Sequence, residues 1–307
     1  MLGVLSGFSV IWVVILFGYV IGRLNVLGPD AQRLLSRLVF FVATPCLMVE
    51  TLSKTNLRAV FSTSLVVAAL SAFAAAGCYL LIAEVFRRRD STTALVGAMS
   101  SSLVNAANLG IPIAVYVLGN ASFAAPVLIF QLAFFTPLFL FLMDVASSGR
   151  RASLKNFLIQ VPRNPILIAS FIGLVIAATG WHPPDLAMQP FNLVGGIAVP
   201  GALLAFGISL YGSKPLQHAG VRTDVLLATA VKLVFQPAVA FLLAKYLLGL
   251  EGHALFAAVV LAALPTAQNV FVAAARYDQG VALAKDTVLL TTAVAVPALV
   301  VVSALLA

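Results

Sequence analysis

Runs of apolar residues, each long enough to cross a lipid bilayer, follow one another along the whole chain with only short polar gaps between them. A helix needs roughly 20 apolar residues to span about 30 Å of hydrocarbon. Of the 307 residues, 62% are hydrophobic and only 9% are charged, whereas a soluble domain carries about 25% charged residues. So few charges cannot cover a water-soluble protein of this size, so the chain is predicted to lie in a lipid bilayer.

The apolar stretches predict an all-α polytopic membrane protein with ten transmembrane helices. Helices are expected because every backbone amide in lipid must find its hydrogen-bond partner within its own segment. Clusters of charged residues, glycine and proline mark the ends of the spans. The ten predicted spans are residues 3–22, 34–52, 59–86, 92–118, 123–143, 165–179, 191–211, 225–248, 254–276 and 288–306.

The lysines and arginines are divided unevenly between alternate gaps, which predicts the orientation in the membrane. Of the 18 basic residues, 13 lie in one set of gaps and three in the other. Both termini are therefore expected on the non-cytoplasmic side of the membrane. The net charge of +8 does not predict nucleic-acid binding, because the basic residues form no continuous stripe.

The two halves of the chain resemble each other. Residues 105–119 align with residues 266–280 without a gap, and Pro137 of span five matches Pro297 of span ten. The identical pairs of that alignment are Ala106/Ala267, Asn108/Asn269, Ala114/Ala275, Tyr116/Tyr277 and Gly119/Gly280. Because each half holds an odd number of spans, the two repeats are predicted to be inverted, and such repeats place the substrate at their interface.

The repeat predicts that the chain is divided into three parts. Residues 1–144 form the first five-helix repeat, and residues 165–307 form the second. Between them, residues 145–164 are a short basic loop, too short to fold as a domain and expected in the cytoplasm.

Span four contains the most informative polar sequence, which is predicted to interrupt the helix near the middle of the membrane. Pro112 cannot donate a hydrogen bond to Asn108, and its ring pushes that turn open. Gly110 adds backbone freedom, and Asn105 lies three residues before Asn108 on the same helical face. A break here frees backbone groups that are costly in hydrocarbon unless they line a polar cavity.

Span nine repeats this pattern, and the two breaks together predict a substrate site. Its polar residues are Pro265, Thr266, Gln268 and Asn269. The N-terminal ends of half-helices favour an anionic group, whereas their C-terminal carbonyls suit a cation. The alternative is that proline and glycine only kink these helices, while the asparagines bond between helices.

Two charged residues are candidate charge partners. Lys232 lies near the middle of span eight, where an unpaired lysine costs from about 2.5 kcal/mol upward. It is either a counter-charge for an anionic substrate or a structural residue that binds freed carbonyls. Glu50 lies at the non-cytoplasmic end of span two. It either has a coupling or gating role in transport or is simply a residue at the membrane interface.

No enzyme motif is present. The three histidines fall in loops without metal-ligand spacing, and no phosphate-binding loop or nucleophile elbow occurs. We therefore expect no enzymatic activity and no cofactor, and the residues leave open whether a metal binds and whether protons or sodium ions drive transport.

Three segments resemble the auxin efflux carrier family. The sequence NAANLGIPIAVYVLG at residues 105–119 is similar to the hallmark of its fourth helix. The sequences VKLVFQP at 231–237 and LPTAQNVFVAAARY at 264–277 resemble its eighth and ninth helices.

The resemblance implies a fold like that of bile-acid symporters and certain sodium/proton antiporters. Spans one, two, six and seven would form a scaffold and a homodimer interface, and the other six a mobile unit. The broken helices four and nine would cross at the substrate site, which Asn108, Pro112, Pro265 and Asn269 match. The long cytoplasmic loop of the plant members is replaced by residues 149–164, which favours a bacterial permease of the inner membrane.

The predicted function is therefore a carrier of small organic anions such as carboxylates, working by an elevator-type movement. The partners expected are the anion and the lipid bilayer, without nucleic acid. One alternative is a sodium-coupled symporter of bile-acid type, with Asn105, Thr266 and Gln268 as candidate cation ligands. Another alternative is a channel or passive receptor of the same fold.

Overall fold

The computed structural model describes residues 2–54, 63–87, 90–148, 165–181, 183–212, 216 and 219–306. Within these ranges the chain is helical, and its one β-type pairing is an isolated bridge. Of the predicted cytoplasmic loop at 145–164, residues 145–148 are helical and residues 149–164 lie outside the described residues, so the basic connector stays a prediction.

The chain forms two compact units of interleaved segments. Unit 1 comprises Met1–Leu65, Ala106–Leu132 and Gln160–Ser213, and unit 2 comprises Val66–Asn105, Ala133–Ile159 and Lys214–Ala307. The resemblance groups spans one, two, six and seven. Unit 1 contains these spans together with the second half of span four and the start of span five, and each unit is described by itself below.

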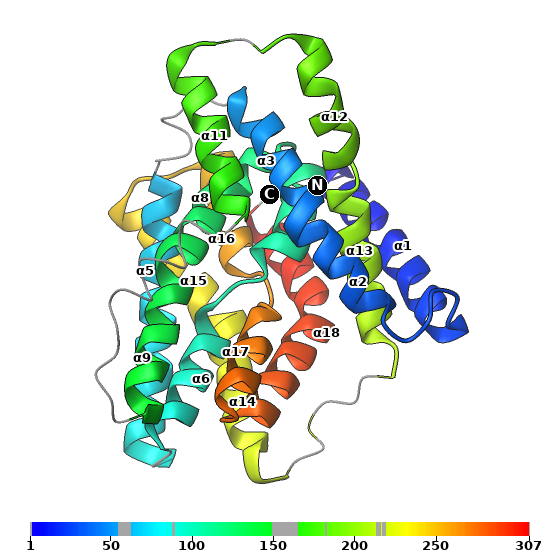
Figure 1. The fold of residues 1–307 in the computed structure, drawn as a ribbon. Helices are drawn as coiled ribbons and strands as arrows, with labels where there is room; N and C mark the ends of the chain where they lie inside the picture. Colours follow the sequence, from blue (N-terminus) through cyan, green and yellow to red (C-terminus); the bar gives the residue numbers. More distant parts are fainter. Residues whose placement is uncertain are drawn as a thin grey trace. The chain divides into compact units, whose positions relative to one another are not determined.

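The helices of unit 1 include both short and long segments (Figure 1). They are α1 (Leu2–Leu24), α2 (Ala31–Leu38), α3 (Thr44–Ser53), α7 (Ile111–Tyr116), α8 (Ala125–Phe130), α11 (Pro165–Thr179), α12 (Asp185–Gly195) and α13 (Ala198–Leu210), with the π-helical turns η1 (Val39–Ala43) and η3 (Ala106–Gly110) and the 3-10 turn η4 (Ala121–Ala124).

Unit 2 contains the remaining helices. They are α5 (Thr63–Ile82), α6 (Ser91–Ser102), α9 (Thr136–Ser148), α14 (Arg222–Ala230), α15 (Gln236–Leu242), α16 (Gly252–Ala262), α17 (Asn269–Tyr277) and α18 (Val281–Leu306), with the π-helical turns η2 (Ala83–Arg87), η8 (Val231–Phe235) and η9 (Leu243–Leu247) and the 3-10 turn η7 (Ala219–Val221). The π-helical turn η5 (Gln131–Phe135) joins α8 to α9.

Five helical segments among the described residues are long and apolar enough to cross a membrane, or six when the bent helix α18 is included. They are Ala31–Ser53, Thr63–Val85, Ala121–Ala146, Asp185–Leu210 and Arg222–Leu247, with Val281–Ala295 and Pro297–Leu306 as the bent pair. Shorter apolar helices fall in predicted spans one, four, six and nine. The polytopic membrane fold is thus confirmed, whereas the count of ten spans in inverted repeats stays a prediction.

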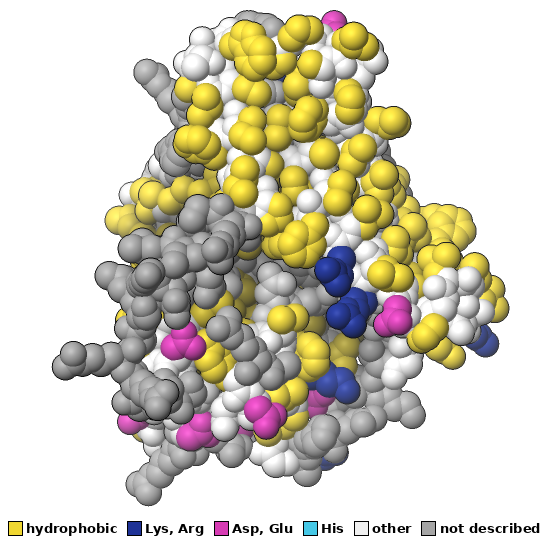
Figure 2. Space-filling view, in the orientation of Figure 1, with side chains coloured by type: hydrophobic (Ala, Val, Ile, Leu, Met, Phe, Trp, Pro, Cys, Tyr) yellow, Lys and Arg dark blue, Asp and Glu magenta, His cyan; other side chains and the backbone are white. Residues whose placement is uncertain are grey.

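Hydrophobic side chains are exposed on the helices that face outward, as expected for a protein in lipid. On α11, Phe171 is 68% exposed, and on α12, Leu186 and Leu193 are 79% and 80% exposed. Figure 2 shows that hydrophobic side chains cover the visible surface over these two helices. Water would not favour such a surface, whereas lipid tails do.

Prolines inside the spans are accommodated by π-helical turns. Each of four such turns lies immediately before a helix with proline as its second residue: Pro45, Pro112, Pro137 and Pro237. Proline lacks an N–H, and its ring clashes with the carbonyl four residues earlier. A wider turn relieves that clash, and at η8 the N–H of Gln236 donates to the carbonyl of Val231, five residues back.

Glycines allow α1 and α13 to approach each other closely in unit 1 (Figure 1). A Cβ atom on Gly207 would lie 2.1 Å from the carbonyl oxygen of Ile15, and one on Gly18 would lie 2.4 Å from that of Leu204. Small residues are the usual means of close helix packing in membranes, because dispersion forces need short separations. The close packing of α1 against α13 in unit 1 therefore depends on Gly18 and Gly207.

We expect Gly207→Ala to destabilise the protein by about 1–3 kcal/mol, because the added methyl group forces the two backbones apart. Gly77→Ala on α5 is the matched control, since a Cβ there meets no atom within 4 Å. Thermal unfolding of both variants in nanodiscs measures the difference. Equal melting temperatures for the two variants would contradict the close packing.

Candidate functional site

Spans four and nine are both interrupted, and their interruptions pair with each other in unit 2. Val104 and Thr266 form an antiparallel bridge. The N–H of Asn105 donates to the carbonyl of Pro265 at 2.8 Å, and the N–H of Ala267 donates to that of Leu103 at 3.0 Å. The two chain breaks therefore satisfy part of each other's backbone hydrogen bonding, in a segment that we call the crossover (residues 103–105 and 263–268).

The break in span four lies earlier than the sequence predicts. We expected it at residues 108–112, but α6 ends at Ser102, and residues 106–110 form the π-helical turn η3, which leads directly into α7. The prediction was wrong in position because the wider turn accommodates Pro112 without opening the helix. In span nine, α16 ends at Ala262 and α17 begins at Asn269, as predicted.

The carbonyls at the ends of α6 and α16 are bonded by side chains of unit 2. The Nε2 of Gln236 donates to the carbonyl of Ser102 at 3.1 Å, and the Oγ1 of Thr266 donates to that of Ser100 at 2.6 Å. The Nζ of Lys232 donates to the carbonyl of Ala262 at 3.3 Å. The last carbonyls of a helix have no partner inside the helix, so these donors stabilise the two helix ends.

Lys232 is fully buried, with 0% of its surface exposed. It lies in the π-helical turn η8, and its Nζ also donates to Oε1 of Gln236 at 2.5 Å. Among the residues that the structure describes, no carboxylate forms an ion pair with it. This geometry matches the second sequence interpretation, a lysine that binds freed carbonyls.

A threonine of α18 joins the crossover from another side. The Oγ1 of Thr291 accepts a hydrogen bond from the N–H of Thr266 at 3.1 Å and donates to the carbonyl of Thr287 at 2.7 Å. All three threonines are fully buried. The polar groups of the crossover thus form a connected network inside an apolar unit.

The predicted site residues divide between the two units. Asn105, Pro265 and Thr266 come together at the crossover, and all are buried. Gln268 is half-buried and Asn269 is exposed at the start of α17.

The other three predicted residues belong to unit 1. Asn108 is half-buried in η3, while Gly110 and Pro112 are buried around the junction of η3 and α7. Their place in the substrate site stays a prediction.

Sequence reasoning missed Gln236 and Thr291. Gln236 lies four residues after Lys232, and residues at that spacing meet on one face of a helix. An amide beside a lysine within an apolar span could have signalled the pair. Thr291 carried no such signal, because threonine often satisfies its hydroxyl within its own helix.

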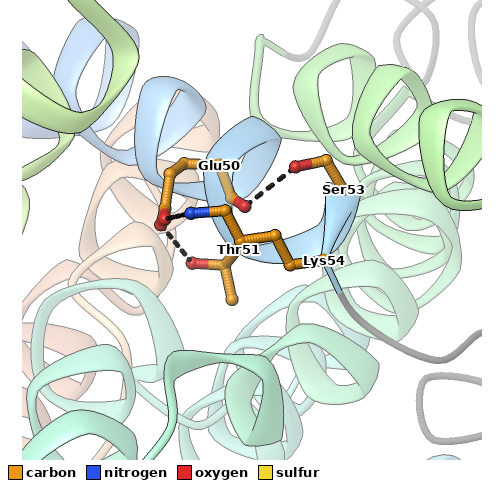
Figure 3. A network of polar contacts seen from close by, with 4 residues as sticks. All are labelled: Glu50, Thr51, Ser53 and Lys54. Atoms are coloured by element: carbon orange, nitrogen blue, oxygen red, sulfur yellow. Dashed lines mark hydrogen bonds and ion pairs between the residues drawn. The ribbon is translucent and has the colours of Figure 1, made fainter. Parts of the chain in front are cut away.

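Glu50 is bonded within its own helix turn (Figure 3). Its Oε1 accepts from the Nζ of Lys54 at 2.6 Å, and its Oε2 accepts from the hydroxyl of Thr51 at 3.4 Å. The hydroxyl of Ser53 donates to the backbone carbonyl of Glu50 at 2.9 Å. The Lys54 side chain is 64% exposed, so the pair fits the interfacial interpretation better than the gating one.

Among the described residues, no group of three or more histidines, cysteines, aspartates or glutamates could hold a metal ion. The polar groups of the crossover and of the side chains bonded to it are hydroxyls, amides, backbone groups and the ammonium of Lys232. These groups can bind and orient a polar solute.

A polar helix crossover within an apolar helical protein is typical of membrane transporters, and the comparisons with known proteins agree. The chain matches the family described as "Membrane transport protein" over residues 8–154 and 146–303. It therefore belongs to this family, the auxin efflux carrier family, and is an integral membrane transporter.

The relatives are transporters of similar length. A protein of Rhizobium meliloti named "Putative malonate transporter" is 24% identical over 288 residues, which cover 92% of this chain and 89% of that protein. An uncharacterized transporter of Methanocaldococcus jannaschii is 22% identical over 290 residues, covering 92% of each chain. The uncharacterized transporter YfdV of Escherichia coli K12 is 24% identical over 279 residues, covering 87% and 86%.

We expect Gln236→Leu to destabilise the protein by about 1–3 kcal/mol, because it leaves Lys232 with one acceptor and the carbonyl of Ser102 without its donor. Adding Lys232→Met should recover part of that loss, since the buried charge is then removed. Thermal unfolding of the single and double variants tests this order. A double variant less stable than Gln236→Leu would contradict it.

Proposed function

We propose that this chain is a secondary carrier of small organic anions such as carboxylates, with its substrate site at the crossover. The observation that carries the proposal is the chemistry of the crossover. The helix carbonyls there, which would attract a cation, already accept hydrogen bonds from Thr266, Gln236 and Lys232. Beside them, Lys232 is a buried positive charge without a carboxylate partner among the described residues, and its field favours an anion over a cation.

The start of α17 adds to this positive character. The first backbone N–H groups of a helix have no partner inside it and carry the positive end of the helix dipole. Asn269 begins α17 with an exposed side chain, immediately after the crossover. The N–H groups of Val270 and Phe271 already donate to the carbonyls of Ala267 and Gln268. The side-chain amide of Asn269 is therefore the group that can donate to a carboxylate, within the positive end of the helix dipole.

The name of the Rhizobium meliloti relative supports a carboxylate as substrate. Malonate carries two carboxylates on one carbon, so one could bind the N-terminal end of α17 while the other is attracted by Lys232. At 24% identity the relative makes malonate the first compound to test on this chain.

Alternating access through an elevator-type movement is part of the proposal. The division of the chain into two compact units supports it, because rigid bodies can move past one another without unfolding. The bacterial inner membrane, the outward position of both termini and a homodimer through the scaffold helices stay predictions from the sequence.

A sodium-coupled symporter is the less favoured alternative. Its expected cation ligands included Asn105, Thr266 and Gln268, but the hydroxyl of Thr266 already donates to the carbonyl of Ser100. The hydroxyl oxygen keeps its two lone pairs while it donates, so this bond is compatible with a bound cation, and the sodium dependence of uptake separates the two functions.

Uptake of labelled malonate into proteoliposomes containing the purified protein tests the proposed function. We expect saturable uptake that occurs with choline in place of sodium, together with counterflow against unlabelled malonate. Uptake that requires sodium would favour the symporter, and linear uptake without counterflow would favour a channel. Absence of binding to every mono- and dicarboxylate in a thermal-shift screen would refute an organic-anion carrier.

Asn108→Ala and Asn269→Ala should each lower the ratio of transport kcat to KM about tenfold or more. The reason is that a hydrogen bond to a charged group contributes about 1.5–3 kcal/mol. Asn192→Ala is the control, because Asn192 is exposed on α12 of unit 1. Uptake kinetics with equal amounts of folded protein give the ratios. Unchanged kinetics in both site variants would exclude these asparagines from the substrate site.

A further inference from the structure

The last residue of α17 is bonded to a neighbouring helix far from the crossover. The hydroxyl of Tyr277 donates to Oδ1 of Asp144 at 2.6 Å, and the carbonyl oxygen of Leu140 lies 3.1 Å from it as a second acceptor. Tyr277 and Asp144 are half-buried, and both acceptors belong to α9. Both helices belong to unit 2, so the bond lies within one compact body.

This bond lies at the opposite end of α17 from the proposed substrate site. The helix runs from Asn269 to Tyr277, so the two ends are about 12 Å apart at roughly 1.5 Å per residue. Its start is held at the crossover by the bond from Ala267 to Leu103. Between the two ends Val270, Ala273 and Ala274 are buried, and the bond of Tyr277 adds a polar restraint on the direction of the helix at its far end.

The inner side of α17 packs against α18, α6 and α9, whereas its outer side is exposed. Phe271 and Val272 are 39% and 64% exposed, so one face of this short helix lacks protein contacts. Beyond Tyr277 the chain turns through Asp278 at φ 51° and Gly280 at φ 60°, and these left-handed residues end the helix. The Tyr277 hydroxyl is thus a specific polar anchor at the end of a helix that is otherwise partly exposed.

The anchor occurs in one of the two predicted repeats. Tyr277 matches Tyr116, and when Pro137 is aligned with Pro297, Asp144 falls on Ala304, which has no side-chain acceptor. Tyr116 is 40% exposed and makes no hydrogen bond with its hydroxyl in the part of the chain that the structure describes. The tyrosine is thus present in both repeats, but only α17 is anchored by it.

We propose that Tyr277 is a positioning residue for the substrate site, acting through its hydrogen bond to Asp144. The bond holds α17 in the direction in which its first turn faces the bound anion. This inference rests on the proposed function. When the bond is lost, α17 occupies that direction for only part of the time. The apparent affinity for the anion then falls in proportion to the fraction of molecules that keep the direction.

The test compares Tyr277→Phe, Asp144→Ala and Asp144→Asn in the full-length protein, with Tyr116→Phe as the matched control. Deuterium exchange of the peptide that contains α17 is measured in nanodiscs, and KM and maximal rate of malonate uptake are measured in proteoliposomes. We expect faster exchange in α17 and a KM raised about fivefold or more in Tyr277→Phe and Asp144→Ala, with a maximal rate near that of the wild type. Asp144→Asn keeps an acceptor oxygen and should stay close to the wild type.

Adding Asp144→Ala to Tyr277→Phe should have little further effect, because Tyr277→Phe already removes the bond to Asp144. Unchanged exchange in α17, or a lower maximal rate at unchanged KM, would overturn the positioning role. An equal effect of Tyr116→Phe would also overturn it. If the wild type carries no carboxylate, the proposed function fails, and the exchange comparison still decides whether the bond holds α17.

Discussion

Backbone groups that are freed inside an apolar protein must find partners, and this requirement shapes the whole molecule. Most of the chain meets it by forming helices, which satisfy their own amides and carbonyls. At the crossover two helices end inside unit 2, and each unpaired polar group there would cost several kcal/mol in an apolar environment. The short pairing between Val104 and Thr266, and the donors Gln236, Thr266 and Lys232, meet that demand.

The same requirement gives the site its chemistry. Three carbonyls at the ends of α6 and α16 accept hydrogen bonds from Gln236, Thr266 and Lys232, and the buried ammonium of Lys232 gives this region a positive character. Under the proposed function, the bonds that stabilise the helix ends and the preference for an anion would be two results of one arrangement. The four prolines that follow π-helical turns show another solution. There the helix continues through a wider turn, although proline cannot donate its backbone hydrogen bond.

The proposed elevator movement would make different demands on the two units. Unit 1 contains the glycine seam between α1 and α13, in which backbones touch at Gly18 and Gly207. Such a seam is rigid because any shift brings backbone atoms into contact. Unit 2 holds the crossover and α17, whose far end is anchored by Tyr277. Under the proposed positioning role, this anchor would hold the direction of the partly exposed helix α17 while unit 2 moves.

Sequence alone determined the membrane class, the helical fold and the transporter family, because scarce charges and long apolar runs leave no other way to satisfy the backbone. It also located the break in span nine, since Pro265 removes a donor where no wide turn compensates. It misplaced the break in span four, because nothing local to Pro112 tells whether a π-helical turn will accommodate it. Only the tertiary structure decided that Gln236 and Thr291 join the crossover and that Lys232 binds a helix carbonyl. Those partners come from helices far apart in sequence, so the energy of their contacts exists only after the chain has folded.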